Sequence, residues 1–315
     1  MAAGHSVGVD PARWQAGLEE LLGRVAGRFG RVEPRWRARA FVLGLLADLP
    51  RKNCWTIAEH AGDTTPDGMQ HLLAGAVWDH DGVRDDVRDY LVEHLGDPGA
   101  VLVVDETGDL KKGASTVGVQ RQYTGTAGKV DNAQVAVYLA YAASAGHGVI
   151  DRELYLPQGW LADAQRCHAA GVPDQVGFAS KPELARVMLE RALDAEVPAG
   201  WVTADEVYGG SPALRGWLET RQLPYVLAVK STEPLTLGSG PSAPAARLAE
   251  HIPRRAGCAS APARAPRAAA GMRGAAWRWP PLARPTGGDA GCCCAAAFAP
   301  GSWRTTRAPA SRACR

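Results

Sequence analysis

The stretch VLVVDETGDLKKG, residues 101–113, changes character in its middle. Four apolar, mostly β-branched residues run into Asp105 and Glu106, and polar, turn-forming residues follow. This pattern predicts a buried strand that ends in a carboxylate. A second stretch, WVTADEVYG at residues 201–209, repeats the arrangement with Asp205 and Glu206. Because many α/β enzymes place functional groups at the carboxyl ends of strands, these two stretches are the first candidates for a site.

The sequence around these stretches predicts a mixed α/β domain over residues 98–235. The expected elements are strands at 101–106, 117–125 and 133–144, a loop over 146–178, a helix over 181–194, a strand at 201–206, a helix over 212–221 and a strand at 224–230. Three consecutive strands indicate a meander. The order β-β-β-α-β-α-β is that of the RNase H-like fold, in which the first and fourth strands are neighbours. Asp105 and Asp205 would then meet despite their separation in the sequence.

Residues 1–97 have a helical periodicity and predict an all-α N-terminal domain. Within it, residues 56–78 read as a short helix, a Gly-Asp-Thr-Thr-Pro turn and a second helix, an outline typical of a DNA-binding helix-turn-helix. A helical bundle with a tight turn fits as well, because four apolar residues of the second helix have the character of core residues. These residues are Met69, Leu72, Leu73 and Val77.

The C-terminal part of the chain differs from the rest in composition and charge. Residues 251–315 contain 11 Arg and one acid, Asp289, so they carry +10, whereas the residues before them carry −8. They hold five of the seven Cys but lack the C-x-x-C spacing of a zinc site. We interpret residues 236–253 as the start of an insertion region. Residues 254–315 are then an Ala/Arg/Pro/Gly/Cys-rich tail, which we expect to be disordered.

The paired strand-end carboxylates suit metal-dependent phosphoryl chemistry. Cleavage of a phosphodiester needs the attacking and leaving oxygens stabilised together, which two divalent ions can do. Mg²⁺ or Mn²⁺ would be held by Asp105 and Asp205, since hard ions prefer carboxylate oxygens. The competing interpretation is that a strand-end Asp caps a turn or the next helix. Glu106 and Glu206 are weaker candidates for ligands, because neighbours on a strand point to opposite faces.

Several basic and aromatic residues are candidates for contact with DNA at the same edge of the sheet. As phosphate contacts and a base-stacking ring, the candidates are Lys111, Lys112, Arg121, Tyr123 and Lys129. The sequence has no HExxH and no GxxxxGK[ST], which argues against a zinc hydrolase or an ATP-driven mechanism. It also has no apolar run of membrane-spanning length and no signal-peptide pattern at its N-terminus, so we expect a cytoplasmic protein with no membrane partner.

Several blocks, taken together and in order, resemble bacterial insertion-sequence transposases of the DDE superfamily. They are VLVVDETGDLKKG, RQYTGTAGKVDNAQVAVYLAYA, DRELYLPQGW, KPELARVMLERALD and WVTADEVYGG, within a resemblance that covers about residues 35–235. The resemblance implies an RNase H-like catalytic domain and Mg²⁺-dependent cut-and-paste transposition. It also implies a homo-oligomer acting on terminal inverted repeats and target DNA. Asp105 matches the first catalytic Asp of the family and Asp205 the second.

The sequence departs from this family in its last part. Members carry a third acid, a Glu on a downstream helix, but this chain has no Glu beyond Glu250. From about residue 254 the composition is that of a shifted reading frame of GC-rich DNA, which predicts a truncated transposase that is inactive as written. Two alternatives remain open: a non-catalytic DNA-binding remnant or regulator of transposition, and an unrelated RNase H-like nuclease. The basic tail could also be a functional disordered arm.

Overall fold

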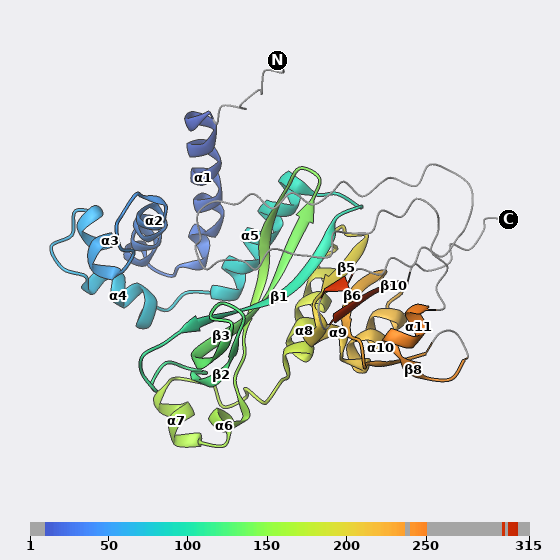
Figure 1. The fold of residues 1–315 in the computed structure, drawn as a ribbon. Coiled ribbons are helices and arrows are strands. Elements are labelled where there is room, and N and C mark those ends of the chain that lie inside the picture. The colour runs from blue at the N-terminus through green and yellow to red at the C-terminus, as the bar shows by residue number, and fades with distance from the viewer. Residues whose placement is uncertain (1–9, 237–239, 251–297, 300–301, 308–315) are drawn as a thin grey trace, which may run out of the picture. The chain divides into compact units, whose positions relative to one another are not determined.

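The computed structural model describes residues 10–236, 240–250, 298–299 and 302–307, which fall into two compact units (Figure 1). The helical unit spans Met1–His94 and the sheet unit spans Leu95–Arg315. In its described part the helical unit comprises α1 (Pro11–Val25), a 3-10 turn η1 (Ala26–Arg28), α2 (Val32–Leu46), α3 (Cys54–His60), α4 (Asp67–Ala74) and α5 (His80–Leu95). The all-α N-terminal region expected from the sequence is confirmed.

Helices α2, α3 and α4 pack against one another around Ile57, Ala58 and Met69. Helix α3 begins with a capping box between Asn53 and Thr56, and the turn after it contains Gly62 at a φ of +83°. The helix, turn and helix expected over residues 56–78 are therefore present.

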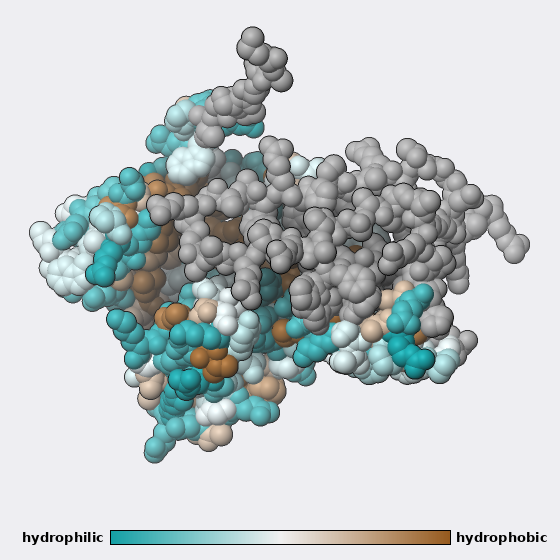
Figure 2. Space-filling model, in the orientation of Figure 1, coloured by the Kyte–Doolittle hydropathy of each residue, from teal (hydrophilic) through white to brown (hydrophobic). Residues whose placement is uncertain are grey.

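The prediction that four residues of the second helix, α4, belong to the core is correct for two of them. Met69 and Leu72 are buried, whereas Leu73 and Val77 are 57% and 91% exposed. Met69 packs with Ile57 and Ala58, and Leu72 packs in a second cluster with Val25 and Phe29, whereas Leu73 belongs to neither cluster. Val77 lies beyond the last residue of α4, which is Ala74. On the face drawn in Figure 2, hydrophobic residues are interspersed with hydrophilic ones.

The sheet unit is organised around one mixed sheet. Its strands are β1 (Val101–Leu110), β2 (Gln120–Thr124), β3 (Lys129–Ala143), β4 (Gly146–Leu154), β5 (Trp201–Ala204), β6 (Tyr225–Lys230), β9 (Phe298–Ala299) and β10 (Ser302–Arg307). The order is β2-β3-β1-β5-β6-β10-β9, and β4 pairs with β3. Strand β5 is parallel to β1 and to β6, and the other pairs are antiparallel. A mixed α/β fold after an N-terminal helical region agrees with the predicted fold class.

Two details of the expected strand order are wrong. The neighbour of β1 is β3 and not β2, so the first three strands do not form a meander. The segment expected as a loop over 146–178 begins with strand β4, which pairs with β3 from Ala143↔Gly146 to Ala136↔Leu154. Both β2 and β4 use the edge of β3 that faces away from β1, β2 along residues 129–133 and β4 along 136–143. Both pairings are hairpins between strands that are adjacent in the sequence, with loops at residues 125–128 and 144–145.

The helices of the sheet unit connect these strands. They are α6 (Gln158–Leu161), α7 (Ala164–Ala169), α8 (Lys181–Asp194), α9 (Glu206–Gly209), α10 (Pro212–Thr220) and α11 (Ala245–Glu250), and a small hairpin is formed by β7 (Pro234–Leu235) and β8 (Ala243–Pro244). Helix α8 begins with a capping box between Ser180 and Glu183, and it packs against β3 and β4. Its buried residues, which include Met188 and Leu189, cover the core face of the sheet.

The tail expected to be disordered, residues 254–315, lies mostly outside the described residues. Of its described pieces, β10 pairs with β6 and β9 pairs with β10. None of the described helices combines the length and the apolar character that a membrane span requires.

Candidate active site

The two strand-end aspartates lie on neighbouring parallel strands. Strands β1 and β5 pair from Val101↔Trp201 to Val104↔Ala204, and the next residues along each strand are Asp105 and Asp205. The strand neighbours predicted from the sequence are therefore confirmed. Because parallel strands end at the same edge of a sheet, the pairing brings both aspartates to one edge.

The backbone around each aspartate holds one oxygen of its carboxylate. Oδ1 of Asp105 accepts a hydrogen bond from the backbone N–H of Glu106 at 2.8 Å. Oδ1 of Asp205 accepts one from the backbone N–H of Val207 at 2.8 Å, which makes Asp205 the N-cap of α9. The capping role considered from the sequence is thus real for Asp205. In both aspartates only Oδ1 is used in this way, and Oδ2 accepts no hydrogen bond from the described residues.

The electrostatic surroundings of both carboxylates disfavour their charge. Both residues are open to solvent at the edge of the sheet, yet the nearby protein reduces their hydration and raises the pKa of Asp105 and Asp205 above the ordinary value. The negative charge of Glu106 raises both values further, and the charges of Asp105 and Glu206 add to the effect on Asp205. A cation bound between the carboxylates would relieve this repulsion.

Glu106 faces the other side of the sheet and has its own partners. It pairs across the strands with Val137, which is buried, whereas Asp105 pairs with Tyr138 on the opposite face. Oε1 of Glu106 accepts a hydrogen bond from Nζ of Lys181 at 2.6 Å, and Oε2 accepts one from the hydroxyl of Tyr208 at 2.6 Å. Burial and the charge of Glu106 raise the pKa of the Tyr208 phenol, which stays protonated.

Sequence reasoning passed over this cluster of Glu106, Lys181 and Tyr208. Glu106 was predicted to be a weaker candidate for a ligand because side chains alternate along a strand, and the register puts Asp105 and Glu106 on opposite faces. One clue was available: Tyr208 lies three residues after Asp205, about one helical turn away.

The candidates for DNA contact lie on β2, at the start of β3 and just after β1. Strand β1 continues past Asp105 to Leu110, β2 pairs with β3 along residues 129–133, and the hydroxyl of Thr124 on β2 donates to the carbonyl oxygen of Gly108 on β1 at 3.3 Å. On β2, Arg121 and Tyr123 are exposed and lie two residues apart, so they share a face. Lys111 and Lys112 follow the end of β1, and Lys129 pairs with Asp131 at 2.9 Å.

The donor atoms present suit a hard divalent cation only in part. Mg²⁺ often binds through one or two protein carboxylates and completes its shell with water and substrate phosphate. Asp105 and Asp205 supply two carboxylates that follow directly on paired strands. In the part of the chain that the structure describes, no group of three or more His, Cys, Asp or Glu side chains is arranged to hold a metal ion.

Residues 24–283 match the sequence model of a family described as DDE superfamily endonuclease. The chain belongs to this family. It is also similar to a protein named "Probable transposase for insertion sequence element IS701" from Microchaete diplosiphon, with 30% identity over 191 residues. That alignment covers 60% of this chain and 47% of the relative, so this DDE superfamily member spans about half the length of the curated relative it matches.

Proposed function

We propose that this chain derives from a transposase that cleaves DNA at the ends of an insertion element and joins them to target DNA. The observation that carries the proposal is the placement of Asp105 and Asp205 at the ends of paired parallel strands, where burial and like charge raise both pKa values. Family membership and the transposase relative support the same reaction class. The intact protein would act in the cytoplasm as a homo-oligomer on terminal inverted repeats.

Asp105 and Asp205 are the residues that would hold Mg²⁺ or Mn²⁺. When bound, such ions supply positive charge beside the attacking and leaving oxygens of a phosphodiester. The chain's own contribution is to orient the two carboxylates. The backbone bonds to Oδ1 of each aspartate fix one oxygen and leave Oδ2 as the proposed ligand atom. Both groups have to be ionised to bind a cation, so binding weakens as the pH falls through their raised pKa values.

We propose further that the chain as written is inactive, because a third carboxylate is missing. No Glu follows Glu250, and the one later acid, Asp289, lies outside the described residues. The loss of one ligand or general base from such a site lowers rates by orders of magnitude. Reading the other two frames of the gene beyond codon 240 tests the cause. A frame that restores strand patterns and a helix-borne Glu supports a frameshift, and two frames without them contradict it.

The test of the site uses the full chain and two measurements, binding of Mn²⁺ and nicking of terminal-repeat DNA. Asp105→Asn and Asp205→Asn are expected to abolish Mn²⁺ binding. The matched control Asp109→Asn, an exposed aspartate on the same strand, is expected to leave it unchanged. Unmutated protein is expected to nick no more than Asp105→Asn does. Nicking by monodisperse protein that Asp105→Asn removes would contradict the inactivity, and nicking that survives Asp105→Asn would contradict the site.

Contact with DNA is proposed for two regions. Helices α3 and α4 would form the helix-turn-helix, with α4 presenting the exposed Gln70 and His71 to base edges. In the sheet unit, Arg121 and Tyr123 would touch the DNA backbone and a base, together with Lys111, Lys112 and Lys129.

A second candidate function is a DNA-binding regulator of transposition without catalysis. The observation that favours it is the combination of an incomplete carboxylate site with 11 Arg in residues 251–315. Such a tail would bind phosphates without sequence preference, and the affinity would fall steeply with salt. A gel shift on terminal-repeat and random DNA separates the regions: a sequence preference implicates the helical unit, and its absence implicates the tail alone.

A further inference from the structure

Glu106 joins three elements of the sheet unit beneath the edge that carries the aspartates. It belongs to β1, Lys181 is the first residue of α8, and Tyr208 belongs to α9. The side chains of Glu106 and Lys181 are 17% and 18% exposed, and Tyr208 is fully buried. Each carboxylate oxygen of Glu106 has its own donor at 2.6 Å. The ammonium of Lys181 balances the negative charge of Glu106, and the phenol of Tyr208 donates the second hydrogen bond. Both carboxylate oxygens therefore have a partner, which makes the cluster rigid.

These contacts form a closed ring that contains both aspartates. Asp105 is bonded covalently to Glu106, and Glu106 is hydrogen-bonded to Tyr208. One turn of α9 leads from Tyr208 back to Asp205, whose carboxylate caps that same helix. The pairing of β5 with β1 then closes the ring. A movement of Tyr208 therefore changes the position of Asp205 relative to Asp105.

Helix α9 also packs closely against strand β6. A Cβ added to Gly209 would lie 1.9 Å from the carbonyl oxygen of Ala228 on β6, so the backbone of α9 lies directly against that strand. With β6 on one side and the hydroxyl bond to Glu106 on the other, the helix that Asp205 caps has little freedom to rotate.

We propose that Glu106, Lys181 and Tyr208 are positioning residues that set the separation of the Asp105 and Asp205 carboxylates, and with it the affinity for a divalent cation. The inference rests on the proposed function, because it assigns the cluster to the same metal site. Groups that orient metal ligands through hydrogen bonds change metal affinity when they are removed, typically by 10- to 100-fold. Glu106 acts through its neighbours and does not itself contact the ion.

The experiment compares two single-atom deletions in the full chain. Tyr208→Phe removes the hydroxyl that bonds to Glu106. Tyr225→Phe is the matched control, because Tyr225 is also buried and donates to a carboxylate oxygen, that of Glu219, at 2.9 Å. The dissociation constant for Mn²⁺ is measured by electron paramagnetic resonance, and the Tm without metal is measured by circular dichroism.

The expected result is a Mn²⁺ affinity at least about 10-fold weaker in Tyr208→Phe and unchanged in Tyr225→Phe, at similar Tm values. Equal affinities in the two variants, or a change only in Tm, overturn the proposal and leave the cluster a purely structural role.

If the unmutated chain binds no Mn²⁺, the proposed function fails, and crystal structures of the unmutated chain and Tyr208→Phe decide the positioning claim alone. A changed separation of the Asp105 and Asp205 carboxylates supports that claim, and an unchanged separation overturns it.

Discussion

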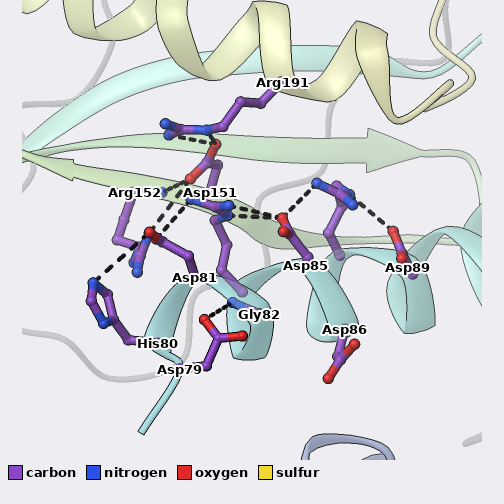
Figure 3. A network of polar contacts seen from close by, with 12 residues as sticks. Asp79, His80, Asp81, Gly82, Asp85, Asp86, Asp89, Asp151, Arg152 and Arg191 are labelled. Carbon is purple, nitrogen blue, oxygen red and sulfur yellow. Dashed lines mark hydrogen bonds and ion pairs between the residues drawn. The ribbon is translucent and has the colours of Figure 1, made fainter. Parts of the chain in front are cut away.

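Helix α8 is tied to the sheet at both ends by ion pairs of different construction. At its C-terminal half, Arg191 bonds to Asp151 at 2.9 Å (Figure 3) and to Glu153 at 2.6 Å, both on β4. At its first residue, Lys181 bonds to Glu106 on β1. The arginine uses its planar fork to satisfy two carboxylates of one strand. The lysine shares its one carboxylate with Tyr208, which belongs to a different element.

The two ends differ in what the ion pair connects: Arg191 bonds to two carboxylates of one strand, whereas Glu106 bonds to residues of two different helices. Asp151 is only 5% exposed and has more than one basic partner, Arg191 at 2.9 Å and Arg152 at 3.8 Å. Glu106 directly follows Asp105, so its donors bear on the geometry of the candidate site. We therefore expect the arginine end to matter for stability alone and the lysine end to matter for both stability and metal binding.

The largest effect on stability is expected from Arg191→Leu. The substitution removes the guanidinium that bonds to Asp151 and Glu153, while Asp151 keeps its contact with Arg152, so the free energy of unfolding falls by about 2.5 kcal/mol. Urea denaturation measures the loss, and the Mn²⁺ affinity of the folded fraction is expected to stay unchanged. The control is Arg186→Ala on the same helix, whose i,i+4 pair with Glu190 is partly exposed and contributes under about 1 kcal/mol. Equal losses in the two variants would contradict the comparison.

A smaller loss, about 1.5 kcal/mol, is expected from Lys181→Met, because Glu106 keeps the hydrogen bond from Tyr208. A double-mutant cycle sharpens the contrast between the two ends of α8. Lys181→Met and Tyr208→Phe act on the same carboxylate and should couple by more than about 0.5 kcal/mol. Arg191→Leu and Tyr208→Phe share no partner and should be additive. Additivity in the first pair would show that Lys181 and Tyr208 act separately.

The position of the two aspartates could be predicted from the sequence, but the cluster of Glu106, Lys181 and Tyr208 could not. Apolar runs that end in Asp105 and Asp205 are local patterns, and the order of elements predicted the pairing of their strands. Strand β4 was missed although it follows β3 through a two-residue turn, because its own sequence, with two Gly and three charged residues, gives a weak strand pattern. The partners of Glu106 are 75 and 102 residues away in the sequence, so no spacing rule reaches them. Local chemistry was therefore predictable, and its support from distant elements was not.

The smallest effect is expected from Asp205→Asn, and its sign depends on pH and metal. Burial raises the pKa of Asp205 in the folded chain above the ordinary value of 3.8, so the folded chain binds this proton more tightly than the unfolded chain does. The stability from this group is fully present below the ordinary pKa and is lost as the pH rises through the raised value. Asn keeps the cap on α9 and removes the charge. Without metal at pH 7, Asp205→Asn should therefore have a higher Tm than the unmutated chain.

Two further conditions separate this explanation from a general effect of the substitution. As the pH is lowered toward the ordinary aspartate value, the difference in Tm should shrink, because both proteins are then uncharged at this position. Mg²⁺ at 100 times its dissociation constant should stabilise only the unmutated chain, by about 2.7 kcal/mol, and reverse the order of the two Tm values. Thermal unfolding with EDTA and with Mg²⁺ measures both. A lower Tm of Asp205→Asn at pH 7 without metal would mean that the carboxylate stabilises the fold in some other way, and the repulsion argued for Asp105 and Asp205 would be wrong.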